Sequence, residues 1–172
     1  MNYKKLSNYE RLLLPQRISD AERSLEWELN SLLAEEYQAW YQYWSVYQFL
    51  RGKERSSIQL KFKEFALDEL TDHAEKLLNR INELNFNCHL STPESWKDYA
   101  QSKFETVQTN DIRSFLALNV QSETDAIIHY RQVIGIADSI NDVTTSELLK
   151  DILADEEEHL SDLQDFLNDL DS

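Results

Sequence analysis

The stretch that decides the fold is Ile152–Leu153–Ala154–Asp155–Glu156–Glu157–Glu158–His159, near the C-terminal end of the chain. Apolar residues around it recur at helical spacing, and the row that they form passes through Glu156 and His159. A carboxylate and an imidazole are costly to bury alone, and much less so when they share a cation. The spacing therefore predicts a core-facing helix that carries a metal-binding pair, provided that other helices supply partners.

Three further helical rows each hold an acid in their middle. Glu-x-x-His projecting inward from a bundle helix is the ligand pair of di-iron and di-manganese carboxylate proteins. One buried glutamate is more often a structural oddity with satisfied hydrogen bonds, whereas four acids in register are hard to assign to chance. The metal ligands that we expect are Glu36, Glu69, His73, Glu123, Glu156 and His159.

The two halves of the chain repeat each other. Glu69 follows Glu36 by 33 residues, and Glu156 follows Glu123 by the same 33 residues. An internal repeat of this kind places equivalent acids on equivalent helices. It predicts two metals, each served by one half of the chain, with glutamates bridging between them.

The repeat is imperfect at one place. His159 follows Glu156 by three residues, but His73 follows Glu69 by four, so that the strict equivalent of His159 is Asp72. Either a one-residue helix bulge brings His73 to the site, or Asp72 replaces the imidazole. Bulges of this kind occur frequently at functional sites, and the apolar row continues unbroken after His73. We therefore favour His73 as the ligand.

Two tyrosines, Tyr43 and Tyr130, stand seven residues after Glu36 and Glu123. Seven residues are about two helical turns, so each tyrosine lies on the face of the acid that precedes it. A buried tyrosine is usually a core residue with a satisfied hydroxyl, and the alternative is a hydrogen bond or an electron donated near the metals. His129 is expected at the surface or lining the interior.

The composition is typical of a single helical domain. The 172 residues can bury a proper core, and only two glycines and two prolines punctuate them. The net charge of −15 excludes nucleic-acid binding by bulk electrostatics. No stretch is long and apolar enough for a membrane span, and the N-terminus has no apolar signal region, so we expect a cytoplasmic protein. Cys88 is the single cysteine, which excludes an internal disulfide.

Capping signals divide the chain into an N-terminal arm, residues 1–18, and a helical domain, residues 19–172. Ser19 or Asp20 is expected to cap a first long helix that ends near Gly52. After a short connection, a cap at Ser56–Ser57 opens a second helix, which continues to about residue 84 and forms a hairpin with the first.

The second hairpin begins at Asp111, which caps a third helix that ends near Asn141–Asp142. Thr144-x-x-Glu147 is a capping box that opens the fourth helix. Between the hairpins, Thr92–Pro93 begins a short helix that lies on the bundle. Two hairpins joined by a long crossover predict an all-α fold, the ferritin-like form of the four-helix bundle.

Four segments in order resemble ferritin-like proteins of the bacterioferritin and Dps-like type, and the resemblance covers roughly residues 20–170. The segments are Leu-Leu-Ala-Glu-Glu-Tyr-x-Ala-Trp-Tyr-Gln-Tyr-Trp (32–44), Asp-Glu-x-x-Asp-His-Ala-Glu-x-Leu (68–77), Asn-Val-x-Ser-Glu-x-x-Ala-Ile-x-x-Tyr (119–130) and Ile-Leu-Ala-Asp-Glu-Glu-Glu-His (152–159). The resemblance implies a ferroxidase with two irons per subunit. Such a protein oxidises Fe(II) with hydrogen peroxide or oxygen and stores Fe(III) in a hollow shell, which protects against oxidative stress.

Carried over residue by residue, the resemblance implies ligands at the acids named above and at His159, whereas His73 matches in type but not in spacing. Bacterioferritins bind haem through a methionine on the second helix, and because Met1 is the only methionine here, we expect no haem. Too few residues follow His159 for the fifth helix of 24-subunit ferritins, so we expect a twelve-subunit homo-oligomer. Dps-like relatives with a thiol pair near the site are not matched, because Cys88 is alone.

Two other classes of protein fit the same rows. A non-storing dimetal oxidase or peroxidase of rubrerythrin type often carries a cysteine-bound iron, for which this chain lacks the thiols. A structural bundle without metal does not account for acids repeated on core faces. Manganese or a mixed pair is the alternative to iron at these ligands, and the sequence favours neither oxidant. At this net charge we expect no nucleic-acid binding at physiological salt.

Overall fold

The computed structural model describes residues 19–50, 55–90, 92–101 and 111–170. The predicted N-terminal arm, residues 1–18, lies outside this description, as do the side chains of the predicted cap at Ser56–Ser57.

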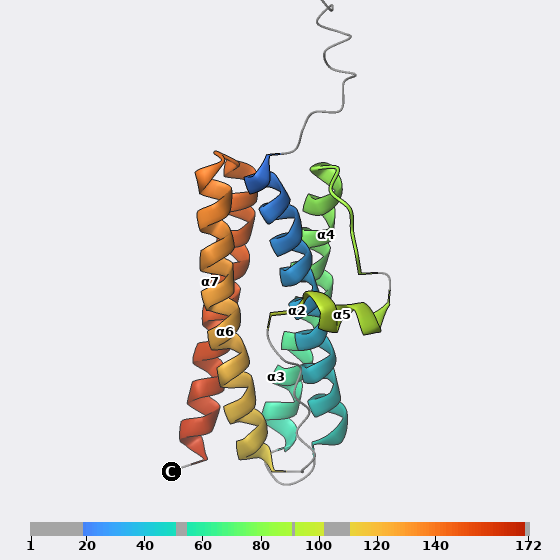
Figure 1. Ribbon diagram of the computed structural model, residues 1–172. Coiled ribbons are helices and arrows are strands. Elements are labelled where there is room, and N and C mark those ends of the chain that lie inside the picture. Colours follow the sequence, from blue (N-terminus) through green and yellow to red (C-terminus); the bar gives the residue numbers. More distant parts are fainter. Residues whose placement is uncertain (1–18, 51–54, 91, 102–110, 171–172) are drawn as a thin grey trace, which may run out of the picture.

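Two antiparallel helical hairpins pack into a four-helix bundle (Figure 1). One hairpin pairs α2 with a rod built from α3, η1 and α4, and the other pairs α6 with α7. The described residues contain helices and no strand, which confirms the predicted all-α fold with a short helix in the crossover. In chain order the helices are α2 (Asp20–Phe49), α3 (Arg55–Asp68), η1 (Glu69–His73), α4 (Ala74–Glu83), α5 (Pro93–Tyr99), α6 (Ile112–Ser139) and α7 (Val143–Asp169).

Side chains at the predicted positions cap two of the helices. Ser19 accepts a hydrogen bond from the backbone N–H of Glu22, whose carboxylate accepts one from the Ser19 N–H in return. This reciprocal pair is a capping box. Asp111 caps α6 by accepting from the Arg113 N–H. The two hairpins therefore begin where the sequence signals place them.

The prediction that Thr144 caps the fourth helix is wrong. Asp142 is the cap, and its carboxylate accepts from the Thr145 N–H at 3.1 Å. The reason lies one residue earlier, where Asn141 adopts a left-handed backbone with φ of 64°. Asparagine tolerates this conformation at the end of a helix, and the Asp142 N–H then closes α6 on the Ala137 carbonyl at 2.9 Å. The last helix therefore begins two residues earlier than the sequence suggested.

The short helix α5 lies across α2, as Figure 1 shows. Aromatic contacts hold it there: the rings of Tyr37 and Trp96 stack with centroids 5.4 Å apart, and those of Trp27 and Tyr99 lie 4.8 Å apart. Such pairs contribute about 0.5–1.5 kcal/mol beyond the area that they bury. The crossover is thereby fixed against the outer side of the first hairpin.

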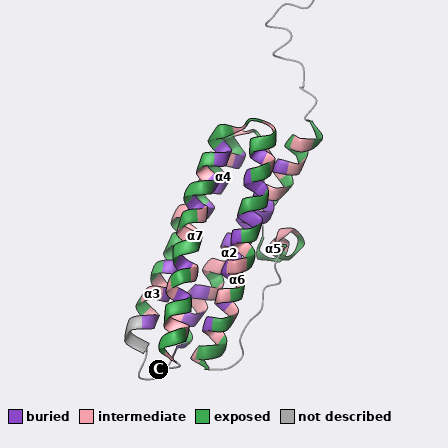
Figure 2. Cartoon of the chain, turned by 90° about the vertical axis from the view of Figure 1, so that its left-hand side faces the viewer, coloured by how far each residue is buried: buried purple, intermediate pink, exposed green. Residues whose placement is uncertain are grey.

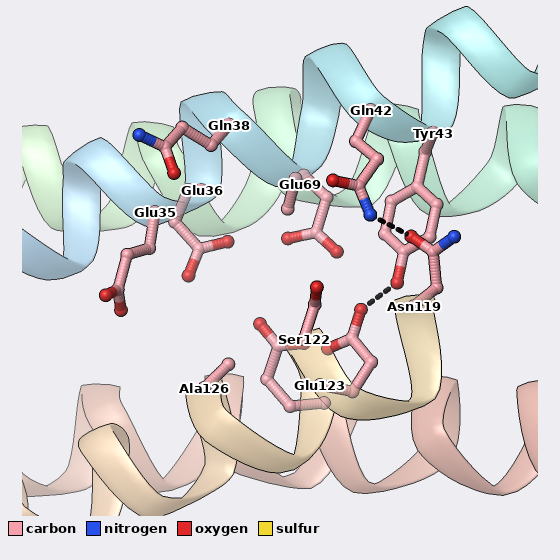
Figure 3. Close-up of a pocket in the computed structure, with 12 residues that line it drawn as sticks. Glu35, Glu36, Gln38, Gln42, Tyr43, Glu69, Asn119, Ser122, Glu123 and Ala126 are labelled. Carbon is pink, nitrogen blue, oxygen red and sulfur yellow. Dashed lines mark hydrogen bonds between the residues drawn. The ribbon is translucent and has the colours of Figure 1, made fainter. Parts of the chain in front are cut away.

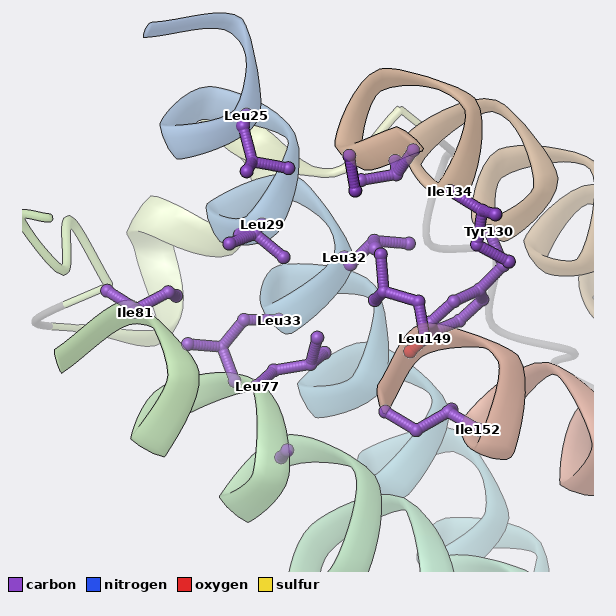
Figure 4. Packing of buried hydrophobic residues seen from close by; sticks show 13 residues of the cluster. Leu25, Leu29, Leu32, Leu33, Leu77, Ile81, Tyr130, Ile134, Leu149 and Ile152 are labelled. Carbon is purple, nitrogen blue, oxygen red and sulfur yellow. The ribbon is translucent and has the colours of Figure 1, made fainter. Parts of the chain in front are cut away.

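The apolar core is divided into two clusters along the bundle axis. Buried residues gather on the sides where the helices face one another (Figure 2). One cluster includes Leu25, Leu29, Leu33, Leu77, Ile81, Leu149 and Ile152 (Figure 4). The other includes Val46, Ile58, Phe62, Phe65, Leu116 and Leu163. Buried polar side chains occupy the helices between the two clusters. No described helix combines the length and apolarity that crossing a membrane requires.

Candidate metal centre

All six predicted ligands converge between the two apolar clusters, and none is more than 5 % exposed. They come from four helical segments of the bundle. Glu36 lies on α2, Glu69 and His73 on η1, Glu123 on α6, and Glu156 and His159 on α7.

The segment η1 is one turn of π-helix inside an otherwise α-helical rod. This wider turn accommodates the additional residue between Glu69 and His73, and it brings the His73 Nδ1 within 3.2 Å of the Glu69 Oε2. Asp72 is only half-buried, and it accepts a hydrogen bond from Lys76 Nζ at 2.6 Å. The structure thus contains the bulge that the four-residue spacing suggested, and it places His73 rather than Asp72 among the carboxylates.

The six side chains form two overlapping groups that share Glu69 and Glu156. One group adds Glu36 and His73, and the ligand atoms of its four residues lie within 4.8 Å of one another. The other group adds Glu123 and His159 at the same closeness. Ligand atoms about 2.1 Å from one metal ion are about 3.0–3.4 Å apart.

The distances around the imidazoles fall close to this range. The His73 Nδ1 is 3.3 Å from Glu36 Oε2 and 3.2 Å from Glu156 Oε1. The His159 Nδ1 is 3.3 Å from Glu69 Oε1 and 3.6 Å from Glu156 Oε2. Both groups are therefore close to the size that a single metal ion requires.

Four buried atoms of the centre have no hydrogen-bond partner among the described residues: Glu69 Oε1, Glu156 Oε2, His73 Nε2 and His159 Nδ1. A buried polar atom left unpaired costs about 1–3 kcal/mol. The His159 Nδ1 lies beside Glu69 Oε1 and Glu156 Oε2, so one cation can satisfy these three atoms together. Carboxylate oxygens with imidazole nitrogens are a donor set that suits iron and manganese. The residues present fit a pair of such ions.

An aspartate stands behind each imidazole. The His73 Nε2 faces Asp155 Oδ2 at 3.5 Å, and the His159 Nε2 faces Asp68 Oδ2 at 3.7 Å. A carboxylate on the far nitrogen orients a metal-binding imidazole and fixes its tautomer. Sequence reasoning missed both aspartates, although each directly precedes a ligand glutamate. That repeated Asp-Glu pair was the available signal.

The four buried acids differ in the direction in which their pKa is shifted. Burial raises the pKa of Glu36 and Glu123 well above the usual carboxyl range, and the charge of Glu156 raises both further. Burial also acts to raise the pKa of Glu69, but hydrogen bonds from Glu36 and the two imidazoles outweigh it and hold that pKa below its ordinary value. Burial and the charge of Glu69 also act to raise the pKa of Glu156, but hydrogen bonds with the two imidazoles outweigh them and lower that pKa.

The pKa values of the two imidazoles are both raised by these acids. Burial disfavours the imidazolium form, but the neighbouring carboxylates of Glu156 and Glu69 raise the pKa of His159 to about 11. The pKa of His73 is also raised, because hydrogen bonds with Glu156, Glu36 and Glu69 outweigh its burial. These opposite pKa shifts favour imidazoliums beside the carboxylates of Glu69 and Glu156 when no metal is bound.

Each buried tyrosine donates to an acid of the other hairpin. The Tyr43 hydroxyl on α2 donates to Glu123 on α6 (Figure 3), and the Tyr130 hydroxyl on α6 donates to Glu36 on α2. Burial and the neighbouring carboxyl groups of Glu36 and Glu156 raise the pKa of Tyr130 well above its usual value, so its hydroxyl remains a protonated donor. The two hydroxyls position the acids that accept from them.

A family model described as the ferritin-like domain matches residues 27–172, most of the chain. The chain belongs to this ferritin-like family. A bacterioferritin of Brucella melitensis biotype 1 is 28% identical over 136 residues, which are 79% of this chain and 78% of that protein. These findings confirm the resemblance that the four sequence segments carry.

Solved ferritin-like structures match over most of their length. The bacterioferritin-related protein of Bacteroides fragilis, described as a dodecameric thioferritin, is 37% identical with a TM-score of 0.82 and covers 94% of each chain. A ferritin-like, diiron-carboxylate protein of Bacillus anthracis str. Ames is 26% identical with a TM-score of 0.73 and covers 87% of this chain and 99% of that one. A Dps protein of Vibrio cholerae O1, 24% identical with a TM-score of 0.78, covers 86% of this chain and 91% of that one and shows the shared fold.

In this ferritin-like chain, a cavity of about 40 Å³ lies between α2 and α6 above the metal centre (Figure 3). Its lining runs from the buried Glu69 and Glu123 to the half-exposed Gln42, Ser122 and Ala126. The lining thus leads from the carboxylates towards the surface of these two helices. This cavity is therefore the candidate approach to the centre for an ion or a small oxidant.

His129 was expected at the surface or as a lining residue, and it lines a cavity beside Gln101. It is 4 % exposed and lies between the carboxylates of Glu28 and Glu35, partners that the sequence did not reveal. Its side chain is buried because these α2 acids and the crossover cover it. A helical pattern on α6 alone does not reveal partners that come from two other segments.

Proposed function

We propose that this chain is a Dps-like ferritin that binds two Fe(II) ions per subunit at the six side chains of the metal centre. It oxidises them with hydrogen peroxide or dioxygen and stores Fe(III) in a hollow shell of twelve subunits. The observation that carries this proposal is the pair of ligand groups sharing Glu69 and Glu156, four of whose buried oxygen and nitrogen atoms have no hydrogen-bond partner among the described residues. Iron held in this way is both substrate and cargo.

The position of each ligand residue suggests its role. Glu69 and Glu156 belong to both groups and are placed to bridge two ions, while Glu36 with His73 and Glu123 with His159 are placed to hold one ion each. With hydrogen peroxide as oxidant, two Fe(II) ions each lose one electron, and the peroxide takes up two protons and leaves as two waters. Carboxylates suit this change, because they can alter how they bind as the charge on iron rises.

Support for a shell comes from the Bacteroides fragilis protein, which is described as dodecameric and aligns over nearly the whole chain. The Vibrio cholerae Dps protein shares the fold at lower identity. With a net charge of −15, we expect the assembled shell not to bind DNA at physiological salt. A gel shift with plasmid measures that directly.

The test is an anaerobic Fe(II) titration of the purified protein, followed by stopped-flow addition of each oxidant and sizing of the product. We expect about two Fe(II) per subunit at the metal centre, then hundreds of irons per particle after oxidation. Glu156→Gln should abolish paired binding, whereas Glu158→Gln, an exposed acid on the same helix, should leave it intact. Paired binding and oxidation without a mineral-filled particle would instead favour a non-storing oxidase. Absence of Fe(II) binding would refute the proposal.

A further inference from the structure

Outside the metal centre, a buried imidazole on α6 meets two acids of α2. The His129 Nδ1 is 2.7 Å from Glu35 Oε2, and its Nε2 is 3.0 Å from Glu28 Oε2. Glu28 and Glu35 are seven residues apart, about two helical turns, so they present their carboxylates on the same side of α2. His129 therefore faces a different carboxylate at each ring nitrogen.

Gln101, which follows α5 in the crossover, closes the cluster. Its backbone N–H donates to Glu35 Oε1 at 2.8 Å. Its side-chain amide nitrogen lies 2.9 Å from Glu28 Oε2 and 2.9 Å from His129 Nε2. Three polar atoms, one each from Glu28, His129 and Gln101, thus form a triangle with edges of 2.9–3.0 Å.

Hydrogen bonds alone do not satisfy this triangle. With Nε2 of His129 protonated, that N–H and the amide of Gln101 are two donors facing each other. With Nε2 unprotonated, its lone pair faces the carboxylate of Glu28. Turning the amide so that its oxygen points inward places two acceptors against each other instead. Each assignment leaves one short edge between like groups.

A cation bound by the three atoms of the triangle would remove the unfavourable contact between like groups, because all three atoms would then be its ligands. The oxygen and nitrogen of a carboxamide have nearly the same shape, so the Gln101 amide can present its oxygen. Three ligand atoms about 2.1 Å from an octahedral ion lie about 3.0 Å apart, which matches the observed edges. The Nδ1–H of His129 then donates to Glu35, the arrangement that orients a metal-binding imidazole.

We propose that Glu28, His129 and Gln101 form a third divalent-cation site, separate from the dimetal centre, with Glu35 as the outer carboxylate that orients the imidazole. Mixed imidazole and oxygen ligands suit first-row divalent ions such as Fe(II), Mn(II) and Zn(II) better than calcium. A cavity of about 230 Å³ beside His129 leaves room for water at the remaining coordination positions. This site does not depend on the proposed ferroxidase function.

The position of the site suggests its use. Glu35 lines both this cavity and the smaller one above the dimetal centre, and Figure 3 shows it beside Glu36 on α2. An ion bound here would lie next to the cavity that leads to the dimetal centre. Its ligands also come from α2, α6 and the crossover, so the bound ion ties these three segments together.

The test is a Zn(II) titration of the full-length protein, with stoichiometry from equilibrium dialysis and coordination from zinc X-ray absorption. We expect about three Zn(II) per subunit, falling by one in His129→Gln and in Glu28→Gln. Glu75→Gln, an exposed acid on α4, is the matched control and should bind as many ions as the unchanged protein. Circular dichroism and particle size establish that each variant is folded.

The outcomes separate this site from the dimetal centre. If the unchanged protein and His129→Gln bind the same number of ions, the third site is refuted, and a fall in melting temperature alone then marks His129 as a structural ion pair. If the unchanged protein binds one ion and His129→Gln binds none, the third site stands and the dimetal proposal fails. Glu28→Gln keeps the side-chain shape at the half-exposed rim, so it tests the site even if His129→Gln does not fold.

Discussion

Loading the dimetal centre with two Fe(II) ions should displace about four protons from each subunit. Burial raises the pKa of Glu36 and Glu123 well above the usual carboxyl range, and we expect both acids to carry a proton when no metal is bound. His73 and His159 are also protonated, because the carboxylates around them outweigh the effect of burial on their pKa values. Iron binds carboxylates and neutral imidazole nitrogens, so all four groups must lose a proton.

Charge balance gives the same count. Without metal, the carboxylates of Glu69 and Glu156 carry two negative charges against two imidazoliums. Two Fe(II) ions add four positive charges to a buried cluster, where net charge is costly. Neutrality is kept only when four protons leave. The overall binding constant for the two ions should therefore fall by about 10⁴ for each unit by which pH is lowered, since four protons compete with them.

The assay is an anaerobic Fe(II) titration at pH 6.5 in weak buffer with an indicator dye, in the His129→Gln background so that only the dimetal centre is loaded. Glu36→Gln is the matched variant, because glutamine has the shape of a protonated glutamate and no proton to release. The release should fall from about four protons to about three. A release of one proton or none in the background protein would refute the assigned protonation of the cluster.

Three further predictions concern single positions. Asp155→Asn should weaken metal binding about 10–100-fold, because it removes the carboxylate behind one imidazole; Asp151→Asn, one turn earlier and exposed, should leave the titration unchanged. Deleting Thr71 should convert the π-turn to α-helix and preserve the metal stoichiometry, whereas deleting Glu75 should turn the preceding part of the helix by about 100° relative to the rest and abolish binding. Leu29→Ala should lower the free energy of unfolding by about 2–5 kcal/mol, because Leu29 is fully buried; a loss below 1 kcal/mol in chemical denaturation would contradict the packing.

The helices and their order were predictable because each long helix carries its own periodic row, and α2 and α6 also carry the predicted caps. Ser19 and Asp111 cap helices through contacts with residues two or three positions away, so the sequence holds the whole interaction. The four acids were predictable for a similar reason, since a charged residue within an apolar row is visible without knowing the neighbouring helix. These are local signals.

The features that the sequence did not reveal depend on contacts between segments far apart in the chain. Asp155 acts on an imidazole of the other hairpin, and nothing on α7 alone distinguishes it from the exposed acids around it. His129 is buried because Glu28, Glu35 and Gln101 reach it from two other segments. The cap at Asp142 required the left-handed backbone of the preceding asparagine, which the sequence permits but does not require.

The tyrosines and aspartates that contact the ligands each reach across from the opposite hairpin. Tyr43 of the first hairpin donates a hydrogen bond to Glu123 of the second. Tyr130 of the second hairpin donates one to Glu36 of the first. Asp68 and Asp155 face the imidazoles in the same crosswise way. Neither hairpin therefore contains a complete half-site, although the repeat assigns each metal ion mainly to one half.

These contacts between the two hairpins also determine the register in which the hairpins pack. Sliding one hairpin by a helical turn, about 5.4 Å, would move its acids into an apolar cluster and leave the opposite tyrosine without its acceptor. The apolar clusters on either side are built largely from interchangeable leucine, isoleucine and phenylalanine contacts, which discriminate weakly between such positions. The polar layer that binds metal thus also specifies the register of the bundle, at the cost in stability that buried polar groups bring.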